Sequence, residues 1–160
     1  AHALRLAPAE VVIEHAEGRA PRLVLPSGTG LCLSSASRGA AAALAVAPGP
    51  VGIDVERVDR EGETPWGVLH PDERADLLSL PAAERPPALA RLWSCKEAYV
   101  KALGLGLARE PDSFRVRFVD EERAAVEDAG VTFDALTRWW RWGGEDFAAS
   151  LVALRPLDRV

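Results

Sequence analysis

The 160-residue sequence predicts an α+β fold, and three observations support this class. Aliphatic residues alternate with acids over Val51 to Glu56, as in a strand. Apolar residues recur at helical spacing from Pro87 to Leu103, and aromatic residues alternate with arginines over Ser113 to Val119. With 48% hydrophobic residues the chain is long enough for a real core, in one domain or in two small halves packed as one.

The first third of the chain predicts short strands. Val11 to His15 and Leu31 to Ser34 have the composition of short strands. Arg38 to Val46 is rich in alanine, which favours helix, but it ends at a Pro/Gly turn, Pro48 to Pro50, just before the strand Val51 to Glu56. We therefore predict a strand over Arg38 to Val46, in a β-hairpin with Val51 to Glu56.

The remainder predicts helices and then strands. The segment Asp59 to Pro65 is polar and contains glycine and proline, so we expect it to connect a first part, residues 1–60, to a second, residues 61–160. Pro71 suits the first turn of a helix, and Gly104 suits the end of the longer one. The elements expected after residue 70 are helices over Pro71–Leu80 and Pro87–Leu103, a strand over Ser113–Val119, and a hairpin of Leu136–Trp142 with Phe147–Leu154.

Composition excludes several classes of function. The net charge is −5 with a pI near 5.3, and no run of basic residues is interleaved with aromatic ones, so nucleic-acid binding is not expected. The longest apolar run, Gly39 to Pro48, is too short to cross a bilayer, and a cytoplasmic location is the default expectation. Cys32 and Cys95 are expected to be reduced thiols. The chain has no methionine and begins at Ala1, which suggests a processed chain or a piece of a longer polypeptide.

Two short segments carry the polar residues of greatest chemical interest. On a strand, Asp54 and Glu56 point to the same face, and two like charges there call for a cation between them. On a helix, Glu97 and Lys101 lie on one stripe, with Lys96 beside it. Acids and lysines in this pattern are suited to a divalent cation and a phosphorylated ligand.

A simpler interpretation exists for each residue taken singly. Glu56 and Glu97 also fit surface acids paired with Arg57 and Lys101, because a Glu followed by a Lys four residues later is common on exposed helices. The combination weighs against it, because the acidic strand is embedded in aliphatics and the helix leads into the glycine-rich exit Gly104 to Gly106.

At these residues the sequence resembles the Sfp-type 4′-phosphopantetheinyl transferases. The segment Gly52 to Glu56 is similar to the family's G-I/V-D-x-E/D strand, and Trp93 to Lys101 to its W/F-S-x-K-E-A/S-x-x-K helix. The resemblance covers about residues 1–155 and implies a pseudo-twofold fold of two similar α/β halves, the N-terminal one shortened, with the site in the cleft between them. Weaker matches are Gly18–Pro21, Leu31–Arg38, His70–Glu73, Gly104–Leu107 and Pro111–Phe114.

The resemblance implies an enzyme that transfers the 4′-phosphopantetheine arm of coenzyme A to a serine of an apo acyl or peptidyl carrier protein. The reaction releases 3′,5′-adenosine bisphosphate and requires Mg²⁺, with Mn²⁺ as a substitute. The context suggested is polyketide or related secondary metabolism, with neighbouring synthase domains as further partners. Two alternatives stay open: a catalytically degenerate scaffold or docking domain within a synthase, and an unrelated Mg²⁺-dependent phosphate-ester hydrolase.

The resemblance also implies a metal site. Asp54, Glu56 and Glu97 would bind Mg²⁺ together with the pyrophosphate of coenzyme A. Glu97 would in addition act as the general base for the carrier serine, directly or through water. Glu73 would be an outer ligand or a hydrogen-bond partner at the metal, although it equally fits an acid in the first turn of a helix.

The remaining implied contacts are to phosphate groups. Lys96 and Lys101 would bind the pyrophosphate and stabilise charge as the anhydride breaks. Arg19 and Ser34 would contact the nucleotide's 3′-phosphate, and Ser35 stands where the family usually has a histidine with the same role. Because serine keeps a donor but loses reach, this departure bears on nucleotide affinity rather than on the chemical step.

Overall fold

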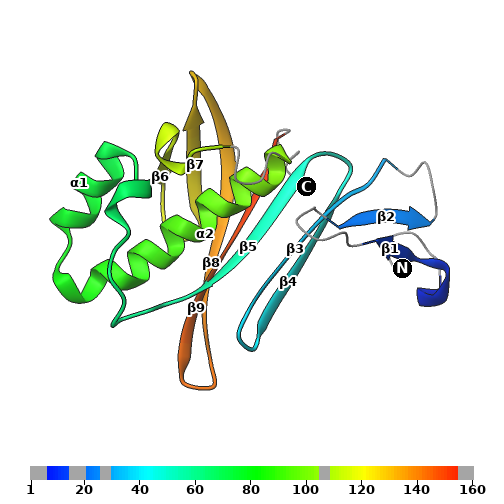
Figure 1. Ribbon diagram of the computed structural model, residues 1–160, viewed down its shortest axis with the longest axis horizontal. Helices are drawn as coiled ribbons and strands as arrows, with labels where there is room; N and C mark the ends of the chain where they lie inside the picture. The colour runs from blue at the N-terminus through cyan, green and yellow to red at the C-terminus, as the bar shows by residue number, and fades with distance from the viewer. Residues whose placement is uncertain (1–6, 15–20, 26–29, 105–108, 155–160) are drawn as a thin grey trace.

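A computed structural model describes residues 7–14, 21–25, 30–104 and 109–154, and its mixture of sheets and helices confirms the α+β class. The main sheet is antiparallel, and the long helix α2 (Arg85–Leu103) packs against it, chiefly on β5 and β9 (Figure 1). In spatial order its strands are β5 (Val51–Arg57), β9 (Glu145–Ala153), β8 (Val131–Trp142), β7 (Arg123–Asp128) and β6 (Arg115–Phe118).

The acidic strand β5 belongs to this main sheet. It pairs with β9 along its whole length, with Asp54 opposite Ser150. The connection predicted near residue 60 does follow β5, yet β5 itself hydrogen-bonds to a strand from the far end of the chain. The division into residues 1–60 and 61–160 therefore stays a prediction, and it does not coincide with a division between sheets.

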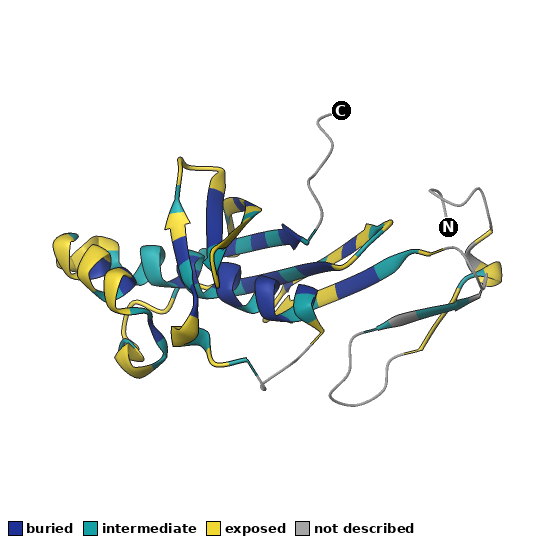
Figure 2. Ribbon diagram, turned by 90° about the horizontal axis from the view of Figure 1, so that it is seen from above, coloured by how far each residue is buried: buried dark blue, intermediate teal, exposed yellow. Residues whose placement is uncertain are grey.

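The residues before β5 form smaller antiparallel sheets. β3 (Cys32–Arg38) pairs with β4 (Ala41–Ala47), and β1 (Val12–Glu14) pairs with β2 (Arg22–Leu25). Figure 2 shows the buried residues concentrated along α2 and the strands behind it, while β1 and β2 lie away from this core. Within the described ranges the N-terminal part holds no α-helix, so the expected likeness between the two halves is not visible there.

The alanine-rich segment is a strand, as predicted, but its predicted hairpin partner is wrong. β4 pairs with β3 and not with β5. The tight turn lies at Gly39, whose φ of +59° is a conformation that glycine adopts without steric cost. Pro48 and Pro50 lack backbone N–H groups, so the second turn cannot continue a regular ladder from β4 into β5.

Both helices agree with the sequence patterns. α1 spans Pro71–Ser79 and begins with a capping box, in which His70 accepts from Asp72 N and Glu73 accepts from His70 N. α2 ends at Gly104, which caps it in the left-handed conformation with φ +69°. The remaining short helices are 3₁₀ turns: η2 (Pro8–Glu10), η3 (Trp66–Val68), η4 (Ala82–Glu84) and η6 (Pro111–Ser113). Among the described helices, none has the length and apolar character needed to cross a membrane.

The contact between β5 and α2 requires a glycine. A Cβ at Gly52 would lie 1.8 Å from the carbonyl oxygen of Ala98 and 2.6 Å from the nitrogen of Ala102, both in the α2 backbone. Gly52 therefore allows the strand to lie directly on the helix. Because Asp54 and Glu56 follow at intervals of two, their side chains project toward the same side of the sheet as α2.

Candidate active site

The two acids of β5 are largely removed from solvent. Asp54 has 6% of its surface exposed, and the side chain of Glu56 has 12%. Between them Val55 faces the other way and packs with Ala41 and Phe147 in a separate apolar cluster. Strand alternation thus places both carboxylates at the helix side and anchors β5 from behind.

Lys101 of α2 is the cation closest to Asp54. Its Nζ lies 2.7 Å from Asp54 Oδ1 and also donates to the carbonyl oxygens of Ile53, at 3.3 Å, and Ser35, at 3.5 Å. One ammonium group therefore connects α2, β5 and β3. Asp54 Oδ2 is buried and has no hydrogen-bond partner among the described residues.

Arg38, at the end of β3, holds Glu56. Its Nη2 donates to both carboxylate oxygens at 2.8 Å, and its Nε donates to Oε2 at 3.0 Å. This paired geometry is the strong form of an arginine–carboxylate interaction. The sequence reasoning missed Arg38, because the contact depends on the β3–β4 turn and joins residues 18 apart in sequence.

Glu97 of α2 completes the acidic group. It is half-buried, and no residue that the structure describes forms a hydrogen bond or ion pair with it. Burial raises its pKa, and the negative charge of Asp54 raises it further, while Lys101 and Arg38 act in the opposite direction. Burial also raises the pKa values of Asp54 and Glu56, against the effects of Lys101 and Arg38. The three acids therefore act on one another electrostatically.

The residues present fit a divalent cation in their chemistry. Three carboxylates interact electrostatically, and one buried oxygen, Asp54 Oδ2, has no hydrogen-bond partner among the described residues; carboxylate oxygens are the donors that Mg²⁺ prefers. In their present positions, however, no three acidic, histidine or cysteine side chains of the described residues form a group able to hold a metal ion. The donors are suitable, and two of them are held by Arg38 and Lys101.

Lys96 and Glu73, which are predicted to take part in this site, form a buried ion pair with each other. Lys96 Nζ is 2.8 Å from Glu73 Oε1, and both side chains are 1% exposed. Lys96 also donates to the carbonyl oxygens of Pro111 and Phe114, at 2.6 and 2.9 Å. Glu73 accepts in addition from His70 N and Val116 N. The pair joins α1, α2 and β6, and protein groups surround the Lys96 ammonium on several sides.

Two of the three residues predicted to contact the 3′-phosphate, Ser34 and Ser35, lie among the described residues. Ser34 is buried, and its hydroxyl accepts a hydrogen bond from Ile53 N at 3.0 Å, which fixes β3 beside β5. Ser35 is exposed on the opposite face of the same strand. Arg19 lies outside the described residues. Of the three predicted residues, Ser35 presents its side chain to solvent and Ser34 serves the contact between strands.

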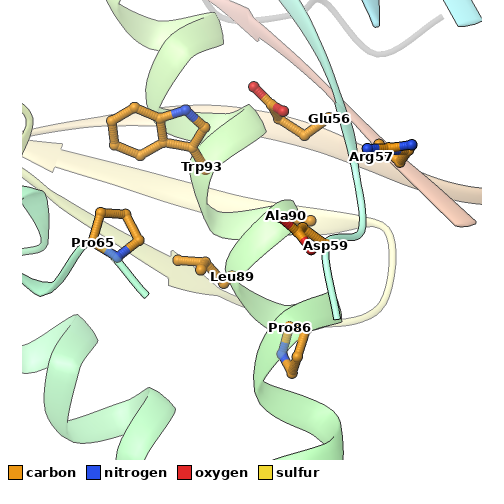
Figure 3. A pocket seen from close by; sticks show the side chains of 8 residues that line it. All are labelled: Glu56, Arg57, Asp59, Pro65, Pro86, Leu89, Ala90 and Trp93. Carbon is orange, nitrogen blue, oxygen red and sulfur yellow. The ribbon is translucent and has the colours of Figure 1, made fainter. Parts of the chain in front are cut away.

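A pocket opens beside Glu56 (Figure 3). Figure 3 shows Trp93 and Glu56 toward one end and Pro86 toward the other. Its walls are mainly apolar, and Glu56 is the one lining residue that belongs to the predicted site. The lining residues are Glu56, Arg57, Asp59, Pro65, Pro86, Leu89, Ala90 and Trp93.

Asp54, Glu56, Glu97 and Lys101 all lie in the part of the chain that matches a known protein family. Residues 50–152, which contain β5, α1, α2 and the rest of the main sheet, match the family model of the 4′-phosphopantetheinyl transferase superfamily. This chain belongs to that superfamily. The resemblance inferred from the two signature segments is thereby confirmed, whereas Arg38 and Ser35 lie outside the matched residues.

Several relatives within the superfamily are similar to parts of the chain. The 4′-phosphopantetheinyl transferase psf-1 of Bacillus pumilus is 35% identical over 83 residues, which are 51% of this chain and 36% of that protein. The holo-[acyl-carrier-protein] synthase of Geobacillus kaustophilus is 35% identical over 79 residues, 45% of this chain and 61% of that protein. The chain thus matches about a third of the length of its Bacillus transferase relatives.

Solved structures of the superfamily are also similar. Holo-[acyl-carrier-protein] synthase from Thermotoga maritima aligns with a TM-score of 0.48 and 24% identity, over 66% of this chain and 64% of that one. The ACPS–CoA complex from Chronobacterium ammoniagenes aligns with a TM-score of 0.44 and 20% identity, over 66% of this chain and 96% of that one.

Proposed function

We propose that this chain transfers the 4′-phosphopantetheine arm of coenzyme A to a serine of an acyl or peptidyl carrier protein, in a reaction that depends on Mg²⁺. The observation that carries the proposal is the set of three carboxylates with Lys101 where β5 meets α2, inside the segment that matches the superfamily. Buried acids that act on one another beside a cation are typical of functional sites.

Lys101 and the carboxylates take separate roles in this proposal. Lys101 holds Asp54 in place and brings a positive charge to the position where negative charge develops on the departing bisphosphate. Asp54, Glu56 and Glu97 would hold Mg²⁺, which neutralises the charge on a pyrophosphate when it is bound.

Glu97 is the proposed general base. Its carboxylate has no hydrogen-bond partner among the described residues, and burial raises its pKa, which makes it a stronger base than an exposed glutamate. As the serine oxygen attacks the phosphorus that bears the pantetheine arm, the hydroxyl proton passes to Glu97, directly or through water. The anhydride P–O bond breaks and 3′,5′-adenosine bisphosphate leaves.

The pocket beside Glu56 suits the less polar part of such a substrate. Its walls include Leu89, Pro86 and Trp93, and Glu56 connects it to the acidic group. A substrate with a phosphate end and an extended, weakly polar chain would place the phosphate at the carboxylates and the chain along these walls.

The experiment that tests the proposal is direct. The chain is mixed with apo carrier proteins, coenzyme A and Mg²⁺, and the carrier is examined by intact-mass spectrometry for the added arm. Modification that is lost when Mg²⁺ is removed with a chelator supports the proposal. Absence of modification on every carrier, with coenzyme A intact, would favour the degenerate scaffold, whereas cleavage of coenzyme A without a carrier would favour the hydrolase. The polyketide context, neighbouring synthase domains and the cytoplasmic location stay predictions.

A further inference from the structure

Arg38 acts on all three carboxylates of the site. Both oxygens of Glu56 accept hydrogen bonds from its guanidinium. Its positive charge also opposes the raised pKa values of Asp54 and Glu97. A single positive group that interacts with all three acids takes the electrostatic place that a bound cation would take.

We infer that Arg38 and the divalent cation compete for Glu56, so that cation binding releases the arginine and loss of the cation restores the Arg38–Glu56 pair. The inference rests on the proposed Mg²⁺-dependent function and adds a residue that sets how tightly the cation binds. It also explains why the three acids do not form a ready metal group in the described residues: Glu56 is turned toward Arg38.

Arg38 is the side chain that dissociates from its carboxylate when the cation binds, whereas Lys101 keeps its contacts. The Arg38 side chain is 54% exposed, and among the described residues only Glu56 accepts hydrogen bonds from its guanidinium. Ion pairs with an exposed member contribute little net stability, so their exchange for a metal ligand costs little. Lys101 has three oxygen acceptors, from Asp54, Ile53 and Ser35, and its side chain is 33% exposed.

The position of Arg38 in the fold suits this exchange. Arg38 is the last residue of β3 and precedes the turn at Gly39. Its long side chain can leave Glu56 by rotation about its own bonds, with the strand unchanged. Once released, Glu56 can act as a metal ligand together with Asp54 Oδ2 and the Glu97 carboxylate, neither of which has a hydrogen-bond partner among the described residues.

The test measures cation binding to the chain without coenzyme A or carrier. Titration calorimetry with Mg²⁺ and with Mn²⁺ gives the dissociation constants of the wild type and of Arg38→Gln. We expect Arg38→Gln to bind either cation about three- to fivefold more tightly, the upper part of the range for removal of a half-exposed ion pair. Arg38→Lys keeps the charge but loses the paired donors, so it is expected to bind more tightly than the wild type and less tightly than Arg38→Gln.

Two controls separate competition from a general change of charge. Arg57→Gln also removes a positive charge next to Glu56, but Arg57 pairs with Glu145, at 2.5 Å, so cation affinity should stay within twofold of the wild type. In a Glu56→Gln background, Arg38→Gln should tighten binding by less than twofold, because the carboxylate under competition is absent and only the weaker effect of the Arg38 charge on Asp54 and Glu97 remains. Thermal unfolding of each variant verifies that it is folded.

The outcomes distinguish this inference from the proposed function. If the wild type, Arg38→Gln and Arg38→Lys bind the cation with equal affinity and still modify the carrier, the role of Arg38 is overturned. The proposed transfer reaction is then unaffected. An equal effect of Arg38→Gln and Arg57→Gln also overturns it, in favour of net charge. Absence of cation binding in every variant, together with absence of carrier modification, overturns both.

Discussion

Lys101 and Asp54 form an ion pair, 2.7 Å between Nζ and Oδ1, that joins the long helix to the strand at the edge of the main sheet. The same ammonium donates to backbone oxygens of β5 and β3, so it also fixes the β3–β4 hairpin against that edge. The acid is buried and its second oxygen has no partner among the described residues. Lys101 therefore contributes both to the packing of α2 and β3 against β5 and to the proposed transfer reaction.

Lys101→Met is expected to reduce both stability and transfer. The buried Asp54 carboxylate would lose its counter-charge, which is expected to cost about 1–3 kcal/mol in the free energy of unfolding, below the range for a fully buried pair because Lys101 is partly exposed. Transfer is expected to fall about 100-fold, the effect of removing one group that stabilises developing charge. Urea unfolding and carrier mass measure the two effects. Asp54→Asn combined with Lys101→Met should recover stability but not transfer, and a single variant as stable as the wild type would contradict the ion pair's role.

Lys96→Met tests whether Lys96 is structural. It leaves Glu73 buried without its cation, and we expect a loss of about 3–5 kcal/mol in the free energy of unfolding. The double variant Lys96→Met, Glu73→Gln removes both charges and should be more stable than the single one. The transfer rate per folded molecule should change less than fivefold in the double variant, since the pair lies apart from the carboxylates. A large loss of rate with the fold intact would return Lys96 to the catalytic group.

Gly52→Ala is expected to destabilise the chain because of steric overlap. The added Cβ would overlap the Ala98 carbonyl oxygen at 1.8 Å, and neither backbone can move without separating β5 from α2. We expect a loss of about 3 kcal/mol or more in the free energy of unfolding, at the upper end for overpacking. Gly67→Ala is a matched control, because a Cβ there meets nothing within 4 Å, and it should unfold as the wild type does. Equal unfolding midpoints for the two variants would contradict the close contact.

The features that the sequence predicted well are local. The alternation over Val51 to Glu56 and the helical spacing up to Gly104 are set by neighbouring residues, and the structure contains both elements. The pairing of strands that are distant in the chain could not be predicted from local patterns. The expected hairpin of β4 with β5 failed because the choice of partner depends on the turn at Gly39 and on β9, which lies about 95 residues after β5 in the chain.

The sequence carries a signal for the different contacts that Lys96 and Lys101 make. Lys96 and Lys101 are five residues apart, which places them about 140° apart around a helix, whereas Glu97 and Lys101 are only about 40° apart. The two lysines therefore lie on different sides of α2, in agreement with the contact of Lys96 with Glu73 and of Lys101 with Asp54. Arg38 offered no such signal, because its contact with Glu56 arises only after β3 has packed beside β5.

Glu97→Gln is expected to stabilise the fold while it abolishes transfer. Burial and the charge of Asp54 raise the pKa of Glu97 above its ordinary value of 4.5, so the folded state holds this proton more tightly than the unfolded state does. As the pH rises through 4.5 the unfolded chain loses the proton first, and stability falls until the pH passes the folded-state pKa. The glutamine variant has no buried carboxylate to deprotonate, so at pH 7 its thermal midpoint should exceed that of the wild type.

The difference between the two midpoints should shrink as the pH falls below 4.5, where Glu97 is protonated in both the folded and the unfolded state. Thermal unfolding of the wild type and of Glu97→Gln between about pH 3.5 and 8, the range in which such carboxylates titrate, measures this difference. A glutamine variant that is less stable at pH 7, or one that still modifies the carrier, would contradict an unpaired, half-buried carboxylate with a role as base.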